Sequence, residues 1–389
     1  MGVHPPRIGY SENGGNEMSI QPPLPIISVE GAPYERGVQY GAQAKAIIER
    51  ILEGYRKALK DRVNLEWNQA LALSKRFLPS IEAYDPEVIV EMKGIAEGAG
   101  RSFEEVLLIN ARSELIFLAR AGGLKVLDES EPGEGCTVMA ATPEVTKNGH
   151  MIVGHNVDWM PGSEKNYIIL EKKKKEGLNF VSILEAGIVG KSGFNAAGLV
   201  AFGNALITDK MKFGIPVQII ANKVLSADSV ADACMYFLPP SRGSSLNRLI
   251  ADEQGLCVNV EMATESFNFL FPEDGILVHT NHFVVPNTKI NDMNVQVKPD
   301  TVLRRHRALQ LLGAERGRIT VDTFKTIFCD HRGYHHSVCQ HVDEKHPEAM
   351  RTQTVLSNIY DVNERTLYIA KGPPCEHEYV ALNFSSILG

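Results

Sequence analysis

The chain changes its pattern of apolar residues between residues 135 and 136, and this change constrains its fold more than any other feature. Before it, apolar side chains recur at helical spacing. Helices are therefore predicted near 33–60, 64–78, 86–99 and 102–121. After it, short β-type runs alternate with turns rich in glycine, asparagine and lysine. Helices followed by many strands predict an α+β fold in which two sheets pack together with helices outside.

The β-type half contains two further helical regions. Strands are expected at 137–141, 151–157, 167–171, 180–184, 198–202, 247–280, 354–361, 366–370 and 378–384. Helices are expected at 215–238, 301–313 and 320–329. The basic run from Lys172 to Lys175 lies between two β-type runs, and its charge predicts a solvated hairpin end.

Composition excludes several classes of protein. The 389-residue chain carries a net charge of −7, which argues against nucleic-acid binding. No stretch approaches the roughly 18 apolar residues of a membrane span. Residues 1–26 lack the apolar run of a signal peptide and are expected to form a disordered tail. The six cysteines form no CxxC pair, so we expect reduced thiols, no structural metal and a cytoplasmic location.

The junction Gly135-Cys136 is a candidate site of self-cleavage, because it follows a stretch at 122–135 that is typical of an exposed loop. Gly135 has no Cβ, so the Cys136 thiol can approach the preceding carbonyl. Attack there would form a thioester, and water would then release the α-amine of Cys136. Such an amine has a pKa of roughly 7.7–8.0 and can accept the thiol proton. One residue would then hold a nucleophile and its base.

Several stretches occur in an order that is more specific than any one of them. They are YERGVQYG at 34–41, GIAEGA at 94–99, NARSE at 110–114, GCT at 135–137, GHNVD at 154–158, EAGIVGKSGFN at 185–195 and HTNH at 279–282. In this order they resemble the acyl-coenzyme A:6-aminopenicillanate acyltransferase (isopenicillin N acyltransferase) family. That family is a branch of the N-terminal-nucleophile hydrolases.

The resemblance implies a four-layer αββα sandwich and cleavage before the cysteine. Residues 27–135 would form a helical α-chain segment, and residues 136–389 a β-chain that packs with it as one αββα unit. The product would be an αβ heterodimer from one precursor, with higher association left open. No cofactor is implied.

The resemblance also implies roles for individual residues. Cys136 would be the nucleophile, and Asp158 would orient its amine and thiol. The side-chain amide of Asn281 would face the oxyanion, where such donors contribute roughly 3 kcal/mol. Asn204 is a weaker candidate for a second oxyanion or substrate contact.

The chain departs from the family pattern at Gln340. The penicillin-forming member has an arginine directly after the cysteine of a Ser-x-Cys stretch, whereas Cys339 is followed by Gln340 here. The missing charge leaves the acyl group and the leaving group open, and Arg332 or Arg351 could substitute for it. It favours hydrolysis of a small N-acyl amide over penicillin-type transfer, in which an acyl-coenzyme A thioester would be the co-substrate.

Two other hypotheses concern different residues. A histidine-assisted cysteine hydrolase would use Cys339 with a neighbouring histidine, and a binding protein without activity would use no nucleophile. Five histidines cluster late in the chain, at positions 331, 335, 336, 341 and 346. Because they form no HExxH frame, we expect no metal there.

Overall fold

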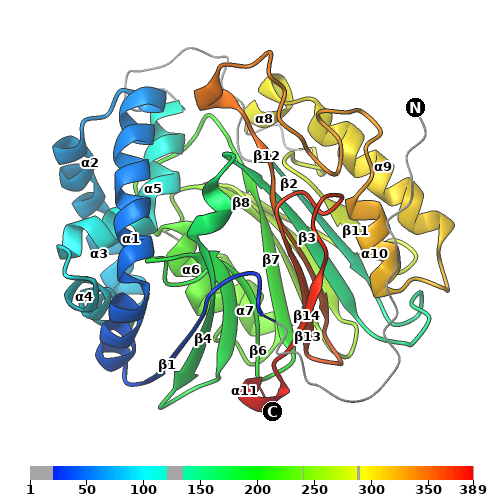
Figure 1. The fold of residues 1–389 in the computed structure, drawn as a ribbon, viewed down its shortest axis with the longest axis horizontal. Coiled ribbons are helices and arrows are strands. Elements are labelled where there is room, and N and C mark those ends of the chain that lie inside the picture. The colour runs from blue at the N-terminus through cyan, green and yellow to red at the C-terminus, as the bar shows by residue number, and fades with distance from the viewer. Residues whose placement is uncertain (1–20, 121–134, 240, 287–289, 389) are drawn as a thin grey trace.

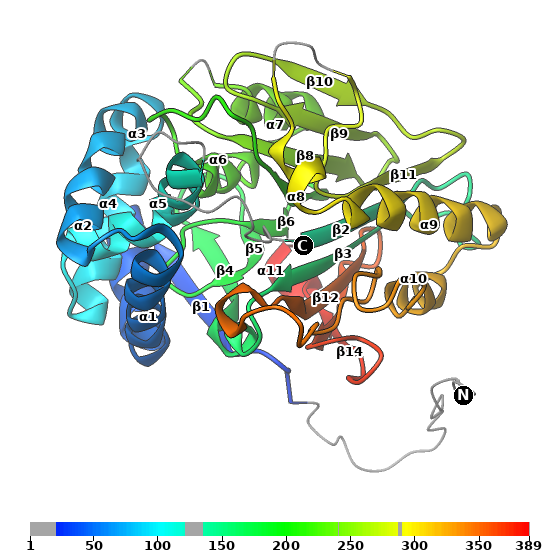
Figure 2. The same ribbon diagram turned by 90° about the horizontal axis from the view of Figure 1, so that it is seen from above.

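The structure, a computed structural model, describes residues 21–120, 135–239, 241–286 and 290–388. Two β-sheets lie face to face, and helices cover the outer face of each one (Figures 1 and 2). The four-layer αββα sandwich implied by the resemblance is therefore confirmed.

Helices before the junction gather on one side of the molecule. They are α1 (Pro33–Val63), α2 (Trp67–Ser74), α3 (Leu78–Tyr84), α4 (Pro86–Ala99) and α5 (Phe103–Arg120). α6 (Val217–Val224) and α7 (Val230–Phe237) join this layer. On the other side lie α9 (Asp300–Ala314) and α10 (Val321–Phe328) (Figure 1). The short α8 (Met293–Val297) precedes α9, and α11 (Ser385–Leu388) ends the described chain.

The first sheet has the strand order β1-β4-β5-β6-β7-β8-β9-β10. Its strands are β1 (Ile26–Gly31), β4 (Tyr167–Lys174), β5 (Phe180–Glu185), β6 (Ser192–Asn195), β7 (Leu199–Leu206), β8 (Ser245–Asp252), β9 (Cys257–Met262) and β10 (Phe267–Leu270). β1 pairs with β4 in parallel, and each of the other neighbouring pairs is antiparallel.

The second sheet is antiparallel and has the order β11-β2-β3-β12-β13-β14. Its strands are β2 (Gly135–Ala141), β3 (Ile152–Trp159), β11 (Ile276–His279), β12 (Gln353–Asp361), β13 (Thr366–Lys371) and β14 (Val380–Asn383). The chain leaves the first helical layer at α5, enters this sheet at Gly135, and so begins β2 at the proposed cleavage site.

Three apolar clusters hold the layers together. One packs helices α1–α7 on the first sheet, the second fills the space between the sheets, and the third packs α9 and α10 on the second sheet. Burying this much apolar surface is the main force that holds such layers together. The first and second clusters both contain side chains from before and after the junction, so the two segments share their cores.

Part of the segment expected as an N-terminal tail belongs to the fold. Residues 1–20 of the segment expected over 1–26 lie outside the described residues. Leu24 is buried, the carbonyl of Pro25 accepts the N–H of Ile169, and Ile26 opens β1. Pairing with β4 explains this order, because the edge of the sheet supplies the hydrogen bonds that a tail would otherwise make to water.

The expected solvated hairpin end is confirmed for Lys173 and Lys175, which are exposed, but the expectation is wrong for Lys172. Its side chain is completely buried and forms an ion pair with Glu91 of α4, at 2.5 Å. The ammonium also donates to the carbonyl of Val189 and to Asn222. A buried charge is tolerated when it is paired and hydrogen-bonded, as this one is. Within the described residues, no helix is long and apolar enough to cross a membrane.

Candidate active site

Strand register brings the expected site residues to one end of the second sheet. Gly135 pairs with Asp158, and Asp158 also pairs with Thr354 on the next strand. On the other side of β2, His279 of β11 pairs with Val138. Asn281 follows His279 by two residues and therefore lies beside Cys136. Four adjacent strands therefore deliver the candidate residues to the same place.

The backbone of Cys136 is held on both sides. Its N–H donates to the side-chain oxygen of Asn281 at 2.7 Å, and its carbonyl accepts from Arg304 Nη1 at 2.7 Å. The residue is only 5% exposed. These bonds hold the nitrogen of the proposed scissile bond and the carbonyl of the peptide that follows it.

Arg304, on α9, connects several parts of the site. The guanidinium is buried and donates to Asp300, to the Thr137 hydroxyl, to the Cys136 carbonyl and to the Asn281 oxygen. A planar guanidinium can serve this many acceptors at fixed angles, whereas an ammonium cannot. Arg304 therefore locks α9, β2 and Asn281 into one arrangement.

The orientation of the Asn281 amide follows from its partners. Its oxygen accepts from the Cys136 N–H and from Arg304 Nη2, and both of these groups can only donate. The amide nitrogen donates to the carbonyl of Ala205 at 3.2 Å. Here Asn281 holds the nitrogen that would become the α-amine. Its expected role as an oxyanion donor stays a prediction.

Two opposite charges lie against Gly135. A Cβ placed on this residue would lie 2.7 Å from Lys298 Nζ and 2.8 Å from Asp158 Oδ2. Both distances are shorter than carbon tolerates. Glycine is thus needed at this position for space beside the carboxylate and the ammonium, since any larger residue would push them aside.

Asp158 is completely enclosed. Thr354 Oγ1 donates to Asp158 Oδ1 at 2.7 Å, and Oδ2 is buried without a hydrogen-bond partner among the described residues. Burial raises the pKa of the Asp158 carboxyl above its usual value, while the charges of Arg304 and Lys298 and the Thr354 hydrogen bond oppose that rise.

Gln340 is connected to this carboxyl through Thr354. Its side-chain oxygen accepts from Lys298 Nζ at 3.2 Å, and its backbone N–H donates to Thr354 Oγ1 at 2.9 Å. Its side-chain nitrogen donates to Thr352. The position where the family pattern departs is therefore part of the frame that holds Asp158 and Lys298.

Neither arginine proposed to replace the missing charge does so. Arg332 is exposed, and Arg351 donates to the backbone carbonyls of His346 and Glu344. The cations that act on Asp158 are instead Arg304 and Lys298.

Asn204 lies on the facing sheet with a free donor. Its oxygen accepts from Asn247 at 3.0 Å, which leaves the buried amide nitrogen without a partner among the described residues. It shares a face of β7 with Phe202, which packs between the sheets, and β7 contacts β2 across the sandwich. An unused amide N–H in such a place is costly unless something accepts it.

A small pocket opens beside Cys136. It has a volume of about 40 Å³ and is bounded by both sheets and by α5 and α6. Its apolar lining includes Phe117, Val217 and Leu246. The polar lining contains His155, Lys191 and Arg248.

The polar groups of the pocket make it positively charged around a neutral imidazole. Burial lowers the pKa of His155 to about 3, helped by the charges of Lys191 and Arg248. Burial also lowers the pKa of Arg248 to about 10, which leaves it cationic near neutral pH. No carboxylate of the described residues forms an ion pair with Arg248, and its Nε has no hydrogen-bond partner there. Both ring nitrogens of His155 are likewise unpartnered within the described chain.

Cys339, the nucleophile of the histidine-assisted alternative, does meet an imidazole. His341 Nε2 lies 3.6 Å from its sulfur. The side chain of Cys339 is completely buried, so its sulfur is not accessible to a substrate carbonyl. Metal-ligating groups also gather around this sulfur.

Sequence reasoning missed Lys298, Arg304 and Thr354. Of these, Arg304 left a signal, because a charged residue falls on the side of the 301–313 pattern that becomes buried. Strand register decides the neighbours of Thr354, and the tertiary fold decides those of Lys298. Neither residue is therefore marked by its sequence context.

Known proteins resemble this chain over most of its length. The family model described as acyl-coenzyme A:6-aminopenicillanic acid acyl-transferase matches residues 145–375. The match includes Asp158, Asn281 and Gln340, and begins after Cys136.

Two curated relatives and one solved structure illustrate the range of similarity. The acyl-coenzyme A:6-aminopenicillanic-acid-acyltransferase 40 kDa form of Emericella nidulans is 24% identical over 364 residues, covering 93% of this chain and 96% of the relative. The beta-alanyl-dopamine/carcinine hydrolase of Drosophila melanogaster is 22% identical over 385 residues, covering 91% and 94%. A variant of the conjugated bile acid hydrolase from Clostridium perfringens superposes with a TM-score of 0.46 at 17% identity, covering 65% and 94%.

Proposed function

This chain belongs to the acyl-coenzyme A:6-aminopenicillanic acid acyl-transferase family, and we propose that it is a self-cleaving N-terminal-cysteine amidohydrolase that acts on a small N-acyl amide. The family comprises acyltransferases and amidohydrolases of the N-terminal-nucleophile type. The observation that carries the proposal is the placement of the Gly135–Cys136 peptide. It is held by Asn281 and Arg304, pressed against Asp158 and Lys298, and borders a pocket.

Self-cleavage would begin with the Cys136 thiol. The sulfur bonds to the Gly135 carbonyl carbon, the bond from that carbon to the Cys136 nitrogen breaks, and the thiol proton goes to the departing nitrogen. Water then cleaves the thioester and leaves a carboxylate on Gly135 and a free amine on Cys136. Gly135 supports this step because it leaves room beside the buried Asp158 and Lys298 side chains.

Turnover would use the same two groups of Cys136. The neutral amine takes the thiol proton, and the thiolate attacks the substrate carbonyl. Asn281 Oδ1, which accepts from the Cys136 nitrogen, would orient the amine. The ammonium proton then passes to the leaving amine, and water resolves the thioester. Asp158 would favour the ammonium form through its negative charge.

The donor for the oxyanion would come from Asn204. Its amide nitrogen has no partner among the described residues, whereas the Asn281 amide nitrogen already binds the Ala205 carbonyl. A preorganised donor that needs no rearrangement is what stabilises developing charge. Asn247 holds the Asn204 oxygen, and therefore fixes the direction of the free N–H groups.

The pocket bears on the substrate class. Arg248 and Lys191 lie beside the nucleophile, and the imidazole of His155 is neutral above about pH 3. Lys191 already lies 4.0 Å from Glu185, but Arg248 is buried without a carboxylate partner among the described residues and so favours a substrate that supplies an anionic group. We therefore propose that the substrate is an N-acyl amide that carries a carboxylate or a similar anion near the scissile bond.

Self-cleavage is tested by Cys136→Ala, Cys136→Ser and the control Cys234→Ala. On a denaturing gel, the wild type and Cys234→Ala should each give two chains, residues 1–135 and 136–389. Cys136→Ala should stay intact and inactive. Cys136→Ser should be cut slowly, because its hydroxyl is a weaker nucleophile. An intact, fully active wild-type protein would contradict the proposal.

Hydrolysis and transfer are separated by mass spectrometry of the Cys136 chain. An N-acyl amide should add its acyl group to Cys136 transiently, and water alone should release it. The penicillin-type alternative predicts stable acylation by an acyl-coenzyme A thioester and release only when an acceptor amine is added. Labelling of Cys339 in place of Cys136 would favour the histidine-assisted alternative.

A further inference from the structure

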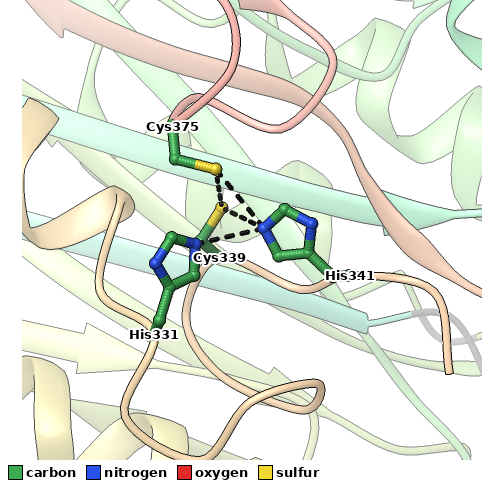
Figure 3. Close-up of side chains that lie close together, drawn as sticks. All are labelled: His331, Cys339, His341 and Cys375. Atoms are coloured by element: carbon green, nitrogen blue, oxygen red, sulfur yellow. Dashed lines mark hydrogen bonds between the residues drawn. The ribbon is translucent and has the colours of Figure 1, made fainter. Parts of the chain in front are cut away.

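Four metal-ligating side chains from distant parts of the chain converge beside the second sheet (Figure 3). His331, Cys339 and His341 lie in the segment between α10 and β12, and Cys375 lies between β13 and β14. Figure 3 shows two sulfurs and two imidazole nitrogens directed at one another. All four atoms lie within 4.8 Å of one another.

Four of the six distances among these atoms are close to the edges of a tetrahedron around one ion. Zinc bonds of about 2.3 Å to sulfur and about 2.05 Å to nitrogen require edges of about 3.8 Å (S–S), 3.3 Å (N–N) and 3.6 Å (S–N). The two sulfurs are 3.6 Å apart, and the Nε2 atoms of His331 and His341 are 3.1 Å apart. His341 Nε2 lies 3.6 Å and 3.3 Å from the sulfurs of Cys339 and Cys375.

The donor set identifies the class of metal. Thiolate and imidazole ligands select zinc and similar soft or borderline cations, whereas magnesium and calcium require oxygen. Two sulfurs and two nitrogens in tetrahedral array leave no position open for water, which is typical of a structural zinc site. We propose that His331, Cys339, His341 and Cys375 bind one structural zinc ion.

The surroundings orient the ligands toward this point. His341 turns its other ring nitrogen, Nδ1, toward the carboxylate of Glu376 at 3.6 Å. A carboxylate behind a ligating histidine is the usual outer contact of a zinc site. The backbone of Cys339 is fixed as well, because its N–H donates to Asp330 and its carbonyl accepts from the Ser337 hydroxyl.

The proposed ion would also brace the candidate active site. Gln340 lies between the ligands Cys339 and His341, and it contacts Lys298 and Thr354. Thr354 in turn donates to Asp158. Zinc would thus fix the segment that holds Asp158, which is a positioning role. Metal binding itself does not depend on the proposed enzymatic function.

The expectation of no metal came from sequence spacing alone. Cys375 is separated from the other three ligands by two strands, so no compact motif marks the set. A second group, formed by His336, Asp343 and His346, also brings ligand atoms together, but it contains no sulfur and has no buried member. It serves as the internal control.

The test measures zinc in the purified full-length protein after incubation with zinc and removal of excess metal. The wild type and the controls Cys234→Ser and His336→Asn should retain one zinc per chain. Cys375→Ser should bind zinc about a hundredfold more weakly. Cys375 is the ligand to change first because it is exposed, so the fold is least disturbed. Equal zinc binding by Cys375→Ser, or loss of zinc in His336→Asn, would overturn the proposal.

Cobalt provides a readout that needs no variant. Cobalt-loaded wild type should absorb with thiolate-to-metal charge transfer and with the strong visible bands of a tetrahedral ion. A chelator should lower the Tm of the wild type and of Cys234→Ser. Cobalt spectra without sulfur bands, a metal-free wild type after reloading, or a Cys339–Cys375 disulfide in the peptide map would each refute the zinc site.

Discussion

Asn281 binds the backbone nitrogen of Cys136 through its side-chain oxygen, at 2.7 Å. The same oxygen accepts from Arg304, so one acceptor serves two buried donors. Asn281→Leu removes this acceptor and should lower kcat/KM about a hundredfold, because the nucleophile loses its fixed position. The variant should also unfold at lower denaturant concentration, since Arg304 Nη2 loses this buried partner. Steady-state kinetics and urea unfolding check both effects. Unchanged kinetics would exclude the positioning role.

The substitution Asn204→Leu distinguishes the role of the Asn204 side-chain amide from that of Asn281. If Asn204 is the oxyanion donor, kcat should fall about a hundredfold to a thousandfold while KM stays close to the wild-type value. Asn204 does not bind the Cys136 nitrogen, so its loss should leave the amine in place. The measurement is a Michaelis–Menten curve on one N-acyl amide. Normal kcat in Asn204→Leu, with loss of kcat in Asn281→Leu, would return the oxyanion role to Asn281.

Gly135→Ala tests the crowding at the cleavage site. The new Cβ would lie within 3 Å of both Lys298 Nζ and Asp158 Oδ2, so these groups must move. Self-cleavage should slow about tenfold to a hundredfold, because small displacements of reacting groups are costly. A time course of precursor loss on a denaturing gel measures it. Gly54→Ala is the control, because nothing lies within 4 Å of the Cβ it adds. Equal rates for the two variants would show that space at residue 135 is irrelevant.

The substitution Thr354→Val should shift the acid limb of the pH–rate profile to higher pH. The Thr354 hydroxyl donates to Asp158, and this hydrogen bond lowers the pKa of the carboxyl. Valine has the same shape but no donor, so the pKa of Asp158 rises further and activity that needs the carboxylate is lost at a higher pH. Profiles of kcat/KM against pH measure the shift. Thr352→Val, which touches Gln340 but not Asp158, should leave the acid limb in place.

Arg248→Met tests the charge of the pocket. Methionine keeps much of the buried stem and removes the guanidinium, so kcat/KM for an N-acyl amide bearing a carboxylate should fall at least about tenfold. A neutral amide of the same size should react at nearly the wild-type rate. Arg242→Met is a matched control, because Arg242 donates to backbone carbonyls away from the pocket. Equal losses on charged and neutral substrates would contradict charge recognition.

Much of the fold could be predicted because it depends on local patterns. Helical spacing and β-type runs marked most elements, and the change at residue 135 coincides with the start of β2. β1 was missed because a short strand at a sheet edge has little pattern of its own. Lys172 was misjudged for a related reason: only the tertiary fold places Glu91 beside it.

The candidate site was predictable only in part. Cys136, Asp158 and Asn281 belong to motifs, and strand register then brings them together. Arg304 and Thr354 are recognised only when α9 and β12 are in place. The Cys339–Cys375 pair shows the same limit, because two intervening strands separate residues whose sulfurs lie 3.6 Å apart.

Glu114 offers a test of stability against pH. This glutamate of α5 is buried and accepts the N–H of Val217 and the hydroxyl of Ser244. Burial raises its pKa from 4.5 to about 7, against the effect of these hydrogen bonds. Between these two values the folded protein keeps a proton that the unfolded chain has lost. The stabilisation is therefore full below pH 4.5 and is lost as the pH rises to about 7.

Glu114→Gln removes this titration while keeping an acceptor for Val217 and Ser244. In this variant, the free energy of unfolding should no longer fall between pH 4.5 and 7. In the wild type, the pKa difference makes this fall about 3 kcal/mol. The new amide nitrogen replaces an oxygen without a hydrogen-bond partner among the described residues, so the slope is a better readout than the absolute value. Urea unfolding at several pH values measures it. Glu82→Gln, on the exposed face of α3, should keep the wild-type slope. A wild-type slope in Glu114→Gln would show that Glu114 does not titrate in this range.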